Sequence, residues 1–491
     1  MKIRNIYLQS ILFFTALVFV PSIAAADSVG QKVVFFVDSS FSINELSSVS
    51  ATLQKDSTNL YFYFENQWFD SKTAEEKEEI NSLLTDLSQE FFYKIYPKLT
   101  TTFGTEFIPG IDNDRKITVL FSSMKDGAAG YVRNIDEYEK TVAPYSNQRE
   151  MIYLNSDIID SPLLKEYLAH EFTHLIEFNQ KEKRIGASED VWLSEAIAEY
   201  AVTLLGYNDS KNENSYLRKR VNAFLNKPYD SVVGWDNKTY DYGSVSMFIH
   251  YLVDHYGINI IVDALRVSEK TGIDSINDIL QKKGLTERFK DIFNDWVIAS
   301  YINDCSFNEK YCYKNDNLKN IHIIPFSNFI PFTGESTLSV SQTISNWSAN
   351  WQKFSGANKT LKLVFDGRNQ NYFKVFYIIR NYSDKYEVKE LKLDANNKGE
   401  IIIPNMGIEK ASVMVIPLVE DSNLSASNSS YFYYSIITTT SNPDNDSGAD
   451  NGEINLPFSI DKPLNQMNKE ELLTVLLKVI IYLFSQGKLT F

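Results

Sequence analysis

Cysteine, histidine and basic residues are all scarce in this chain. Its 491 residues include two cysteines and five histidines, and the net charge is -15 with a pI near 5.0. A zinc site built from Cys305 and Cys312 is not expected, because no further cysteine or histidine ligand lies near them in the sequence. The acidic balance argues against nucleic acid as a partner, since phosphate groups would repel it. No internal repeat indicates a solenoid.

Long hydrophobic runs are also few, and the one at the amino terminus has the character of a secretory signal peptide. Lys2 and Arg4 precede an apolar run at 11–20, and Ala24, Ala25 and Ala26 offer small residues for cleavage. The run is too short for a retained membrane span, and no cysteine follows it for lipid attachment. We therefore expect a signal peptide at 1–26, a mature chain from Asp27 and an extracellular location. In that oxidising environment Cys305 and Cys312 are expected to form a disulfide.

The chemistry of the sequence is concentrated in AHEFTHLIEF, residues 169–178. His170 and His174 are one helical turn apart, so their imidazoles share a helix face and can hold one metal ion. Glu171 follows the first histidine, where its carboxylate can take a proton from a water that the metal activates. The three other histidines lack this ligand spacing, which makes a carboxylate the expected third ligand.

A second predicted helix, WLSEAIAEYA at 192–201, supplies two candidate carboxylates four residues apart, Glu195 and Glu199. Together the two stretches resemble the gluzincin metallopeptidases, in which a glutamate on the next helix completes a His, His, Glu zinc site. This resemblance implies that Glu195 is the third zinc ligand. In thermolysin-like members an acidic residue four positions later holds a zinc-bound imidazole, which implies that role for Glu199. One zinc ion is therefore the expected cofactor.

A tyrosine is expected to complete the catalytic machinery. The segment TYDYGSVSMFIHYLVDHYG, 239–257, resembles the tyrosine-bearing segment that follows the zinc motif in zinc aminopeptidases. The resemblance implies that Tyr240 donates a hydrogen bond to the oxyanion of the tetrahedral intermediate, with Tyr242 as the alternative.

The hydrophobic patterns predict an α+β chain with several parts. The predicted order is a mixed α/β part at 27–160, a helical part with the zinc site at 161–335, a β-sandwich at 336–440, a polar linker at 441–458 and a C-terminal helix at 459–491. The first zinc helix is predicted to begin with Ser161 as N-cap and Pro162 at the first helical position. The C-terminal helix is apolar around most of its circumference, which predicts self-association or contact with the cell envelope.

Two further features have both functional and plain structural interpretations. Asp112, Asn113 and Asp114 offer oxygen ligands for a calcium ion, although a simple turn is the favoured interpretation. The strand MIYLN, 151–155, precedes the zinc helix, and in gluzincins the strand at this position is a sheet edge that pairs with the substrate. The structural alternative is a buried strand. Other acidic residues near the motif, Glu177, Glu182 and Glu189, are interpreted as surface charge.

Residues 50–303 resemble the secreted bacterial metallopeptidases of the hyicolysin family. The resemblance is carried by FGTEFIPGIDNDRKITVLF, GYVRNIDEY, SNQREMIYLNSD, YLAHEFTHLIEF, WLSEAIAEYA and DYGSVSMFIHYLVDHYG, in that order. It departs from the common W-L-N-E-G pattern at Ser194 and Ala196. The implied activity is a secreted zinc endopeptidase that acts on proteins or peptides with a gluzincin-like catalytic region. An aminopeptidase is one alternative, and a catalytically silent adhesive or envelope-binding protein with a structural metal is another.

Overall fold

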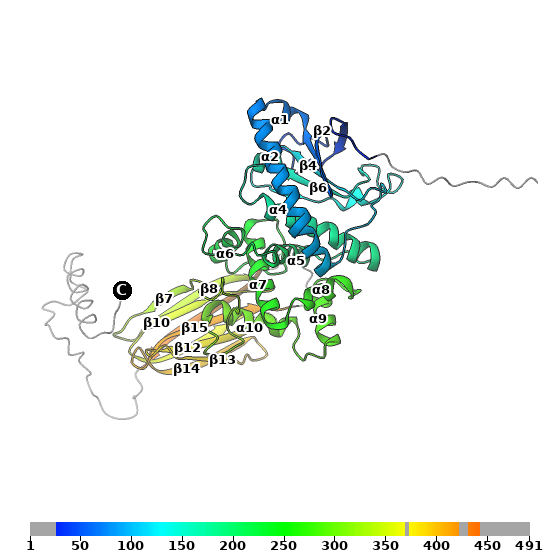
Figure 1. The fold of residues 1–491 in the computed structure, drawn as a ribbon. Helices are drawn as coiled ribbons and strands as arrows, with labels where there is room; N and C mark the ends of the chain where they lie inside the picture. Colours follow the sequence, from blue (N-terminus) through cyan, green and yellow to red (C-terminus); the bar gives the residue numbers. More distant parts are fainter. Residues whose placement is uncertain (1–25, 369–372, 422–430, 442–491) are drawn as a thin grey trace, which may run out of the picture. The chain divides into compact units, whose positions relative to one another are not determined.

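A computed structural model describes residues 26–368, 373–421 and 431–441 (Figure 1). Helices and sheets both occur throughout these ranges, so the α+β class is confirmed. The predicted signal peptide, linker and C-terminal helix lie outside the described residues, except for Ala26 and Ser441. The described residues fall in one compact unit.

The amino-terminal part is built on a six-stranded sheet with the order β1-β2-β3-β4-β6-β5. Strands β3, β4 and β6 are parallel, and β5 is antiparallel to β6 at the edge. The strands are β1 Lys32–Phe36, β2 Ser48–Asp56, β3 Leu60–Glu65, β4 Ile117–Ser122, β5 Gly130–Tyr131 and β6 Met151–Asn155.

Alternation along β3 explains how this sheet is covered on both faces. Leu60, Phe62 and Phe64 point into the main core, which also contains apolar side chains of the helices. Tyr61 and Tyr63 belong to a separate cluster on the opposite face. Successive strand residues point to opposite faces, and the first five residues of β3 are all large and apolar or aromatic, so the strand requires cover on both sides.

The helices of the amino-terminal part lie beside the sheet, and those of the central part follow it in the chain. Figure 1 shows the long helix α2 beside the sheet and the zinc-motif helix α4 below it. The helices are α1 Asn66–Asp70, α2 Ala74–Glu90, α3 Tyr96–Phe103, α4 Leu164–Glu177, α5 Val191–Leu204, α6 Tyr216–Asn226, α7 Thr239–Tyr256, α8 Asn259–Arg266, α9 Gly272–Lys282 and α10 Phe289–Ile302. Short 3-10 turns lie at Asn134–Glu137 and Ser156–Ile158, and π-helical turns follow α2 at Phe91–Ile95 and α4 at Phe178–Lys183.

The start of α4 differs from the sequence prediction. The helix begins at Leu164, and Leu163 is the residue that precedes it. Ser161 and Pro162 lie in a turn in which the Leu164 N–H donates to the Ser161 carbonyl. Proline fixes its own backbone in a conformation that this turn also accepts, so it marks the approach to the helix rather than its first residue.

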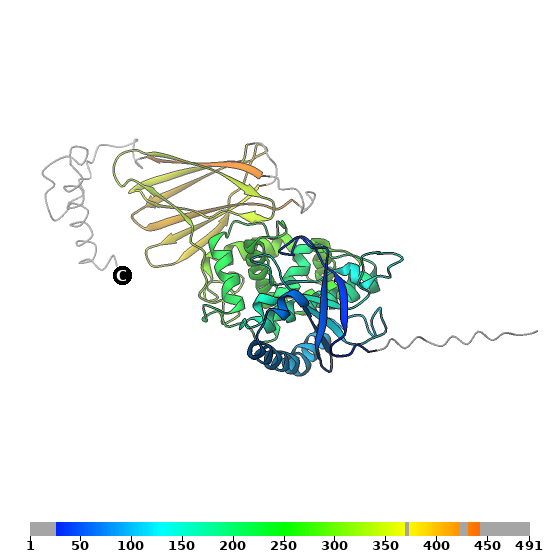
Figure 2. The same ribbon diagram turned by 90° about the horizontal axis from the view of Figure 1, so that it is seen from above.

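The carboxyl-terminal part is rich in strands, most of them paired antiparallel, and it begins at β7, before the predicted boundary at residue 336. Side chains of β10, β12 and β15 and side chains of β11 and β16 fill one common core cluster, so the strands pack as two layers (Figure 2). The strands are β7 Phe326–Ile330, β8 Thr337–Ser345, β9 Ser348–Ala349, β10 Gln352–Gly356, β11 Lys359–Asp366, β12 Phe373–Asn381, β13 Tyr386–Glu390, β14 Lys398–Met406, β15 Lys410–Val419 and β16 Tyr431–Ser441.

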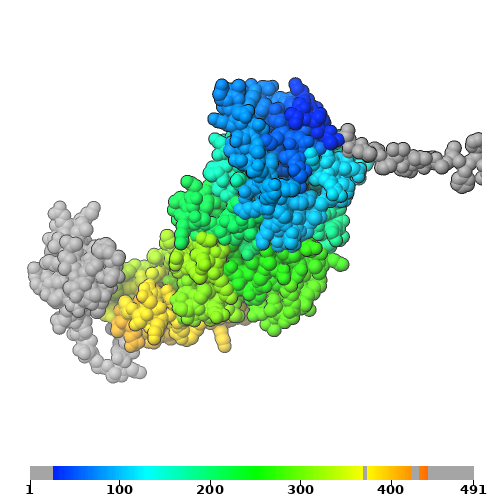
Figure 3. All heavy atoms as spheres, viewed as in Figure 1, coloured from blue at the N-terminus to red at the C-terminus, as the bar shows by residue number. Residues whose placement is uncertain are grey.

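The β-rich part and the helical part share side chains in the main core. Figure 3 shows the yellow and orange β-rich part in direct contact with the green helical part. The Trp347 ring lies 5.0 Å from that of Phe289 and 5.4 Å from that of Phe293, both on α10. The Trp351 indole N–H donates to the Val297 carbonyl at 3.2 Å. These contacts place the strands firmly against α10.

Two smaller features complete the fold. Cys305 and Cys312 form a disulfide, as predicted, with their Cα atoms 5.1 Å apart. Within the described ranges, no single helix is long and apolar enough to cross a membrane. Helices α7 and α8 meet the criterion only as a pair, and the pair is bent by 106°.

Candidate metal centre

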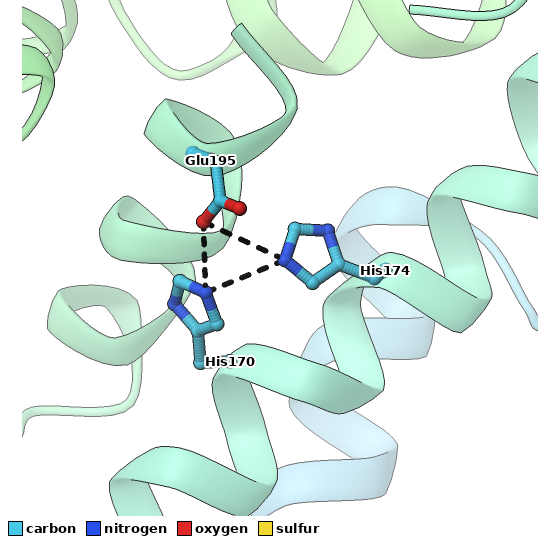
Figure 4. Close-up of side chains that lie close together, drawn as sticks. All are labelled: His170, His174 and Glu195. Atoms are coloured by element: carbon cyan, nitrogen blue, oxygen red, sulfur yellow. Dashed lines mark hydrogen bonds and ion pairs between the residues drawn. The ribbon is translucent and has the colours of Figure 1, made fainter. Parts of the chain in front are cut away.

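Two neighbouring helices bring His170, His174 and Glu195 together (Figure 4). The apolar face of α4 packs into the core through Leu168 and Phe172, which turns the two histidines toward α5. One potential ligand atom from each of the three side chains lies within 4.8 Å of the other two. Among the described residues, no other set of three histidine, cysteine or carboxylate side chains meets this distance.

The distances among the three ligand atoms suit one small metal ion. His170 Nε2 lies 3.3 Å from His174 Nε2 and 3.1 Å from Glu195 Oε2, and His174 Nε2 lies 3.8 Å from Glu195 Oε2. Tetrahedral zinc with bonds of about 2.1 Å separates its ligands by roughly 3.4 Å. Two imidazoles and one carboxylate are a common zinc ligand set in hydrolases, and that set leaves a fourth position open. The donor atoms therefore fit zinc.

The His170 ring is oriented by the Tyr216 hydroxyl on α6, which lies 3.1 Å from its Nδ1. The same hydroxyl donates to Glu199 Oε1 at 2.7 Å and accepts a hydrogen bond from Arg220 at 2.9 Å. A tyrosine oxygen has one proton and two lone pairs. Since its proton is committed to Glu199, it accepts from His170 Nδ1–H, and this leaves the Nε2 lone pair free to bind a metal.

Glu199 therefore supports His170 mainly through Tyr216. Its own Oε1 lies 3.6 Å from His170 Nδ1, which is longer than a hydrogen bond. The carboxylate is almost fully buried and is bound at both oxygens by the Arg220 guanidinium, at 2.7 and 2.9 Å. The resemblance implies that Glu199 holds a ligand imidazole directly; in the structure Tyr216 lies between Glu199 and His170, and Arg220 binds the carboxylate.

The His174 ring is oriented in the same way by a different pair of residues. Its Nδ1 lies 3.1 Å from Glu177 Oε2 and 3.2 Å from the Ser194 hydroxyl, which itself donates to Glu177. The interpretation of Glu177 as surface charge is wrong, because the residue is 5% exposed and lines the site. Glu189, also interpreted as surface charge, is buried and pairs with Lys181 at 3.3 Å. Glu182 lies partly buried and accepts a hydrogen bond from the Tyr138 hydroxyl.

The carboxylates at the site have opposite pKa shifts. Burial raises the pKa of Glu171, and the charges of His170 and His174 only partly oppose this effect. Burial also acts to raise the pKa of Glu195, but the two histidine rings, 3.1 and 3.8 Å from its Oε2, outweigh this effect and hold the pKa below its usual value. A ligand that stays ionised beside a more basic carboxylate is the combination that metal binding and proton transfer require.

A cavity of about 500 Å³ opens onto this group. His170, Glu171, His174 and Glu195 all line it. Tyr242 also lines it, with its ring centroid 6.4 Å from that of His170. The cavity therefore joins the three candidate ligands, the candidate base and a tyrosine hydroxyl.

Tyr240, the first choice from the sequence, is not among the residues that line this cavity. Its ring lies instead under the Lys227 ammonium, 3.4 Å from the ring centroid. Both tyrosines are in the first turn of α7, where two positions apart means nearly opposite faces of the helix. The alternative, Tyr242, is the residue that the fold brings to the site.

The strand at the edge of the sheet is also not the predicted one. Met151–Asn155 forms β6, which is hydrogen-bonded to β4 on one side and to β5 on the other. Gly130 and Tyr131 of β5 are the edge residues, and both line the cavity. A Cβ atom added to Gly130 would come within 3.1 Å of Glu171 Cγ, so the edge strand runs directly beside the candidate base.

The aspartates of the calcium prediction are engaged in a turn. The Asp114 N–H donates to Asp112 Oδ1 at 2.9 Å, and the Lys116 N–H donates to Asp114 Oδ1 at 3.1 Å. Asn113, between them, has a positive φ of 61°. These contacts are those of a turn, the favoured interpretation, and calcium binding at Asp112, Asn113 and Asp114 stays a prediction.

Comparisons with known proteins add little to this picture. No family model matches the chain, and no curated protein matches it. Solved structures that match a part of it include the pre-peptidase C-terminal domain of a collagenase from Bacillus anthracis, at 13% identity over 23% of this chain and 96% of that one, with a TM-score of 0.17. Another is PliG of Salmonella Typhimurium, a periplasmic inhibitor of g-type lysozyme, at 14% identity over 24% of this chain and 100% of that one, also with a TM-score of 0.17. Scores this low carry no argument about fold or function.

Proposed function

We propose that this chain is a secreted zinc metalloendopeptidase with a gluzincin-like catalytic region, similar to the hyicolysin family. The observation that carries the proposal is the convergence of His170 Nε2, His174 Nε2 and Glu195 Oε2 within 3.1 to 3.8 Å of one another. Both histidine Nδ1 atoms are held by other side chains, so the two free nitrogens face the carboxylate.

A zinc ion held by these three residues would polarise a scissile carbonyl and lower the pKa of water. Glu171 lines the same cavity beside the three ligands, where its carboxylate would take the proton of the attacking water and deliver it to the leaving amine. Tyr242 lines the same cavity, and its hydroxyl donates to Asn237 Oδ1 at 3.3 Å. Turned from that partner, the hydroxyl would be a donor to the oxyanion that forms at the carbonyl.

The edge strand β5 gives the cavity a means of holding an extended polypeptide. A strand at the edge of a sheet has backbone N–H and C=O groups that no neighbouring strand pairs on its outer side. A substrate that adds itself to Gly130 and Tyr131 would pass directly over Glu171. Binding along a strand needs no free amino terminus, which favours internal cleavage over removal of terminal residues.

The proposal is tested with the full secreted chain and with two variants, Glu171→Gln and His174→Ala. Glu171→Gln keeps the size of the side chain, so it should bind zinc and lose at least about a hundredfold in casein hydrolysis, because it lacks the base. His174→Ala should lose zinc as well, because it removes a ligand. Glu269→Gln changes an exposed carboxylate that neither lines this cavity nor belongs to the metal centre; it is the control and should keep its activity.

Peptide libraries with blocked and with free amino termini distinguish an endopeptidase from an aminopeptidase and from a silent binding protein. An endopeptidase should cleave a peptide library whose amino termini are acetylated, whereas an aminopeptidase should cleave only the unblocked library. A silent binding protein would load zinc and cleave neither. Full activity in Glu171→Gln would remove the proposed mechanism.

A further inference from the structure

A second cavity of about 490 Å³ lies between the helical part and the β-rich part. Its walls come from the segment between α6 and α7, from β8 and from the first residue of β16. Trp235 lines both this cavity and the one at the metal centre. The Trp235 ring also packs edge-on against Tyr242, with centroids 4.9 Å apart. The two cavities therefore share one wall.

Acidic groups dominate the charged lining of this second cavity. Asp230, Asp236 and Asp241 line it against a single lysine, Lys227. Lys227 pairs with one oxygen of Asp230 at 2.7 Å. The other oxygen, Asp230 Oδ2, is buried and receives no hydrogen bond from any described residue. The cavity floor thus has negative charge that its one lysine does not fully offset.

Burial raises the pKa of Asp230 to about 7, the Asp241 carboxylate adds to the shift, and Lys227 opposes it. Asp230 is therefore only partly ionised near neutral pH. Asp241 itself is buried and accepts the backbone N–H groups of Asp236 and Lys238. Both hydrogen bonds go to Asp241 Oδ2, which therefore holds the start of α7.

Asp236 is the carboxylate that is open to a ligand. It is exposed, it lines the cavity, and its side chain has no hydrogen bond or ion pair with the residues that the structure describes. The Asn346 amide, by contrast, is already bonded to the backbone of Asp421 and Trp347. The Ser231 hydroxyl is bonded to the Asn346 carbonyl and to the Gly234 N–H. Those groups form the wall and are not free for recognition.

Exposed aromatic rings stand around the same opening. Tyr229 is 39% exposed, Phe326 is 44% exposed and Tyr431 is 60% exposed, although each lines the cavity. The Tyr229 and Phe326 ring centroids are 5.9 Å apart. Ring faces beside an unpaired carboxylate are the components with which proteins bind an ammonium or guanidinium group.

We propose that this cavity is a subsite for a lysine or arginine side chain of the polypeptide substrate, with Asp236 as its ionic partner and the exposed rings packed along its stem. The inference rests on the proposed peptidase function, because it assigns part of the substrate to a position beside the catalytic cavity. Trp235 is the point at which a bound polypeptide would pass from one cavity to the other. Cleavage is therefore directed to bonds at a fixed distance from a basic residue.

The test uses fluorescence-quenched peptides with acetylated amino termini and one arginine, moved one position at a time through an otherwise neutral sequence. Each has a partner with citrulline, which has the shape of arginine without its charge. At one or two positions the arginine peptide should have a kcat/KM about tenfold higher, mostly through KM. Asp236→Asn should bring that ratio close to one and leave cleavage of the citrulline peptide unchanged.

The control is Asp274→Asn, which removes an exposed carboxylate that lines neither cavity and should leave the ratio as it is. Equal rates for arginine and citrulline at every position in the unaltered enzyme would overturn the proposal. So would a preference for arginine that survives in Asp236→Asn.

A binding measurement separates this inference from the peptidase proposal. The Glu171→Gln chain is titrated calorimetrically with the best arginine peptide and with its citrulline partner. If no peptide is cleaved, the peptidase proposal fails, yet arginine-dependent binding that Asp236→Asn abolishes would still support the subsite. If arginine gives no tighter binding than citrulline, the subsite is wrong whatever the activity.

Discussion

Tyr242 and Tyr240 are two residues apart on α7, and only Tyr242 lines the catalytic cavity. Tyr242→Phe should lower kcat about a hundredfold, because it removes a donor to the oxyanion and no metal ligand. Tyr240→Phe is the matched control and should change kcat by less than about twofold. Steady-state kinetics together with zinc content check both variants. A fall in kcat in Tyr240→Phe alone would return the role to the first sequence prediction.

Glu177 is a second residue whose role follows from its contacts. It accepts hydrogen bonds that orient His174, so Glu177→Ala should weaken zinc binding by about 10- to 100-fold while the fold is retained. Competition with a chromophoric chelator measures that affinity. Glu182→Ala, on the next turn, serves as the control. Equal zinc affinity in both variants would mean that Ser194 alone suffices to hold the ring.

Glu150 makes stability depend on pH. Burial raises its pKa to about 7, with Glu137 and Asp112 beside it, whereas an exposed glutamate in the unfolded chain titrates near 4.5. Between these values the folded chain keeps a proton that the unfolded chain releases, so stability falls as pH rises from about 4.5 to 7 and is level above that.

Glu150→Gln removes this penalty because its side chain never ionises. The variant should exceed the unaltered protein in stability by about 2 to 3 kcal/mol at pH 8 and by much less at pH 5. Urea denaturation at the two pH values checks this. A gain of the same size at both would mean that the amide acts through a new hydrogen bond and not through the charge.

Among the elements, β5 is the one whose position matters most for catalysis. A Cβ atom at Gly130 would come within 2.8 Å of the Tyr153 carbonyl oxygen and 2.9 Å of Leu154 Cδ2, so Gly130→Ala must push the strand outward. We expect kcat/KM for long peptides to fall about tenfold or more with zinc content unchanged, since the strand edge moves relative to Glu171. Activity equal to that of the unaltered enzyme would remove β5 as the substrate edge.

The elements also show what periodicity in the sequence can predict. Strong apolar character or helical spacing marks the strand at Lys32–Phe36 and the two helices with the candidate ligands, so the sequence predicts them. β2 has no such mark, since SVSATLQKD has a lysine and several small polar residues in place of a clear apolar run. The two residues of β5 are too few to show a period.

The residues of the candidate site also differ in how far the sequence predicts them. His170, Glu171 and His174 are visible as a motif because helix geometry converts local spacing into a shared face. Tyr216 is 46 residues from His170 and Arg220 is 21 residues from Glu199, so only the packing of α6 brings them to the site. Glu177 did have a signal, three positions after His174, but the same spacing is common on solvated helix faces.

At the scale of the whole molecule, the described part should unfold as one unit. Trp347 of the β-rich part is 2% exposed and packs on Phe289 and Phe293 of α10. Trp347→Ala should cost about 3 to 5 kcal/mol and lower the melting temperature of both parts together. Ile402→Ala, at a position that is 62% exposed, should change stability by less than about 1 kcal/mol.

Differential scanning calorimetry, with zinc-site activity followed in parallel, measures the effect of Trp347→Ala. The expected record is one transition, shifted to lower temperature, at which activity is also lost. Two separated transitions, with activity surviving the first, would show that the parts are energetically independent.

The connection between the helical part and the β-rich part bears on whether the proposed peptidase would survive cleavage by its own copies. A peptidase at high local concentration is exposed to cleavage by its own copies, and connections between parts are the usual targets. The chain between Ile302 and Phe326 is tied down by the disulfide, by Tyr313, which is 1% exposed, and by Asn303, whose amide bonds the Leu318 and Ile321 carbonyls. If the chain is the proposed secreted peptidase, self-digestion should therefore leave this connection intact and the β-rich part attached.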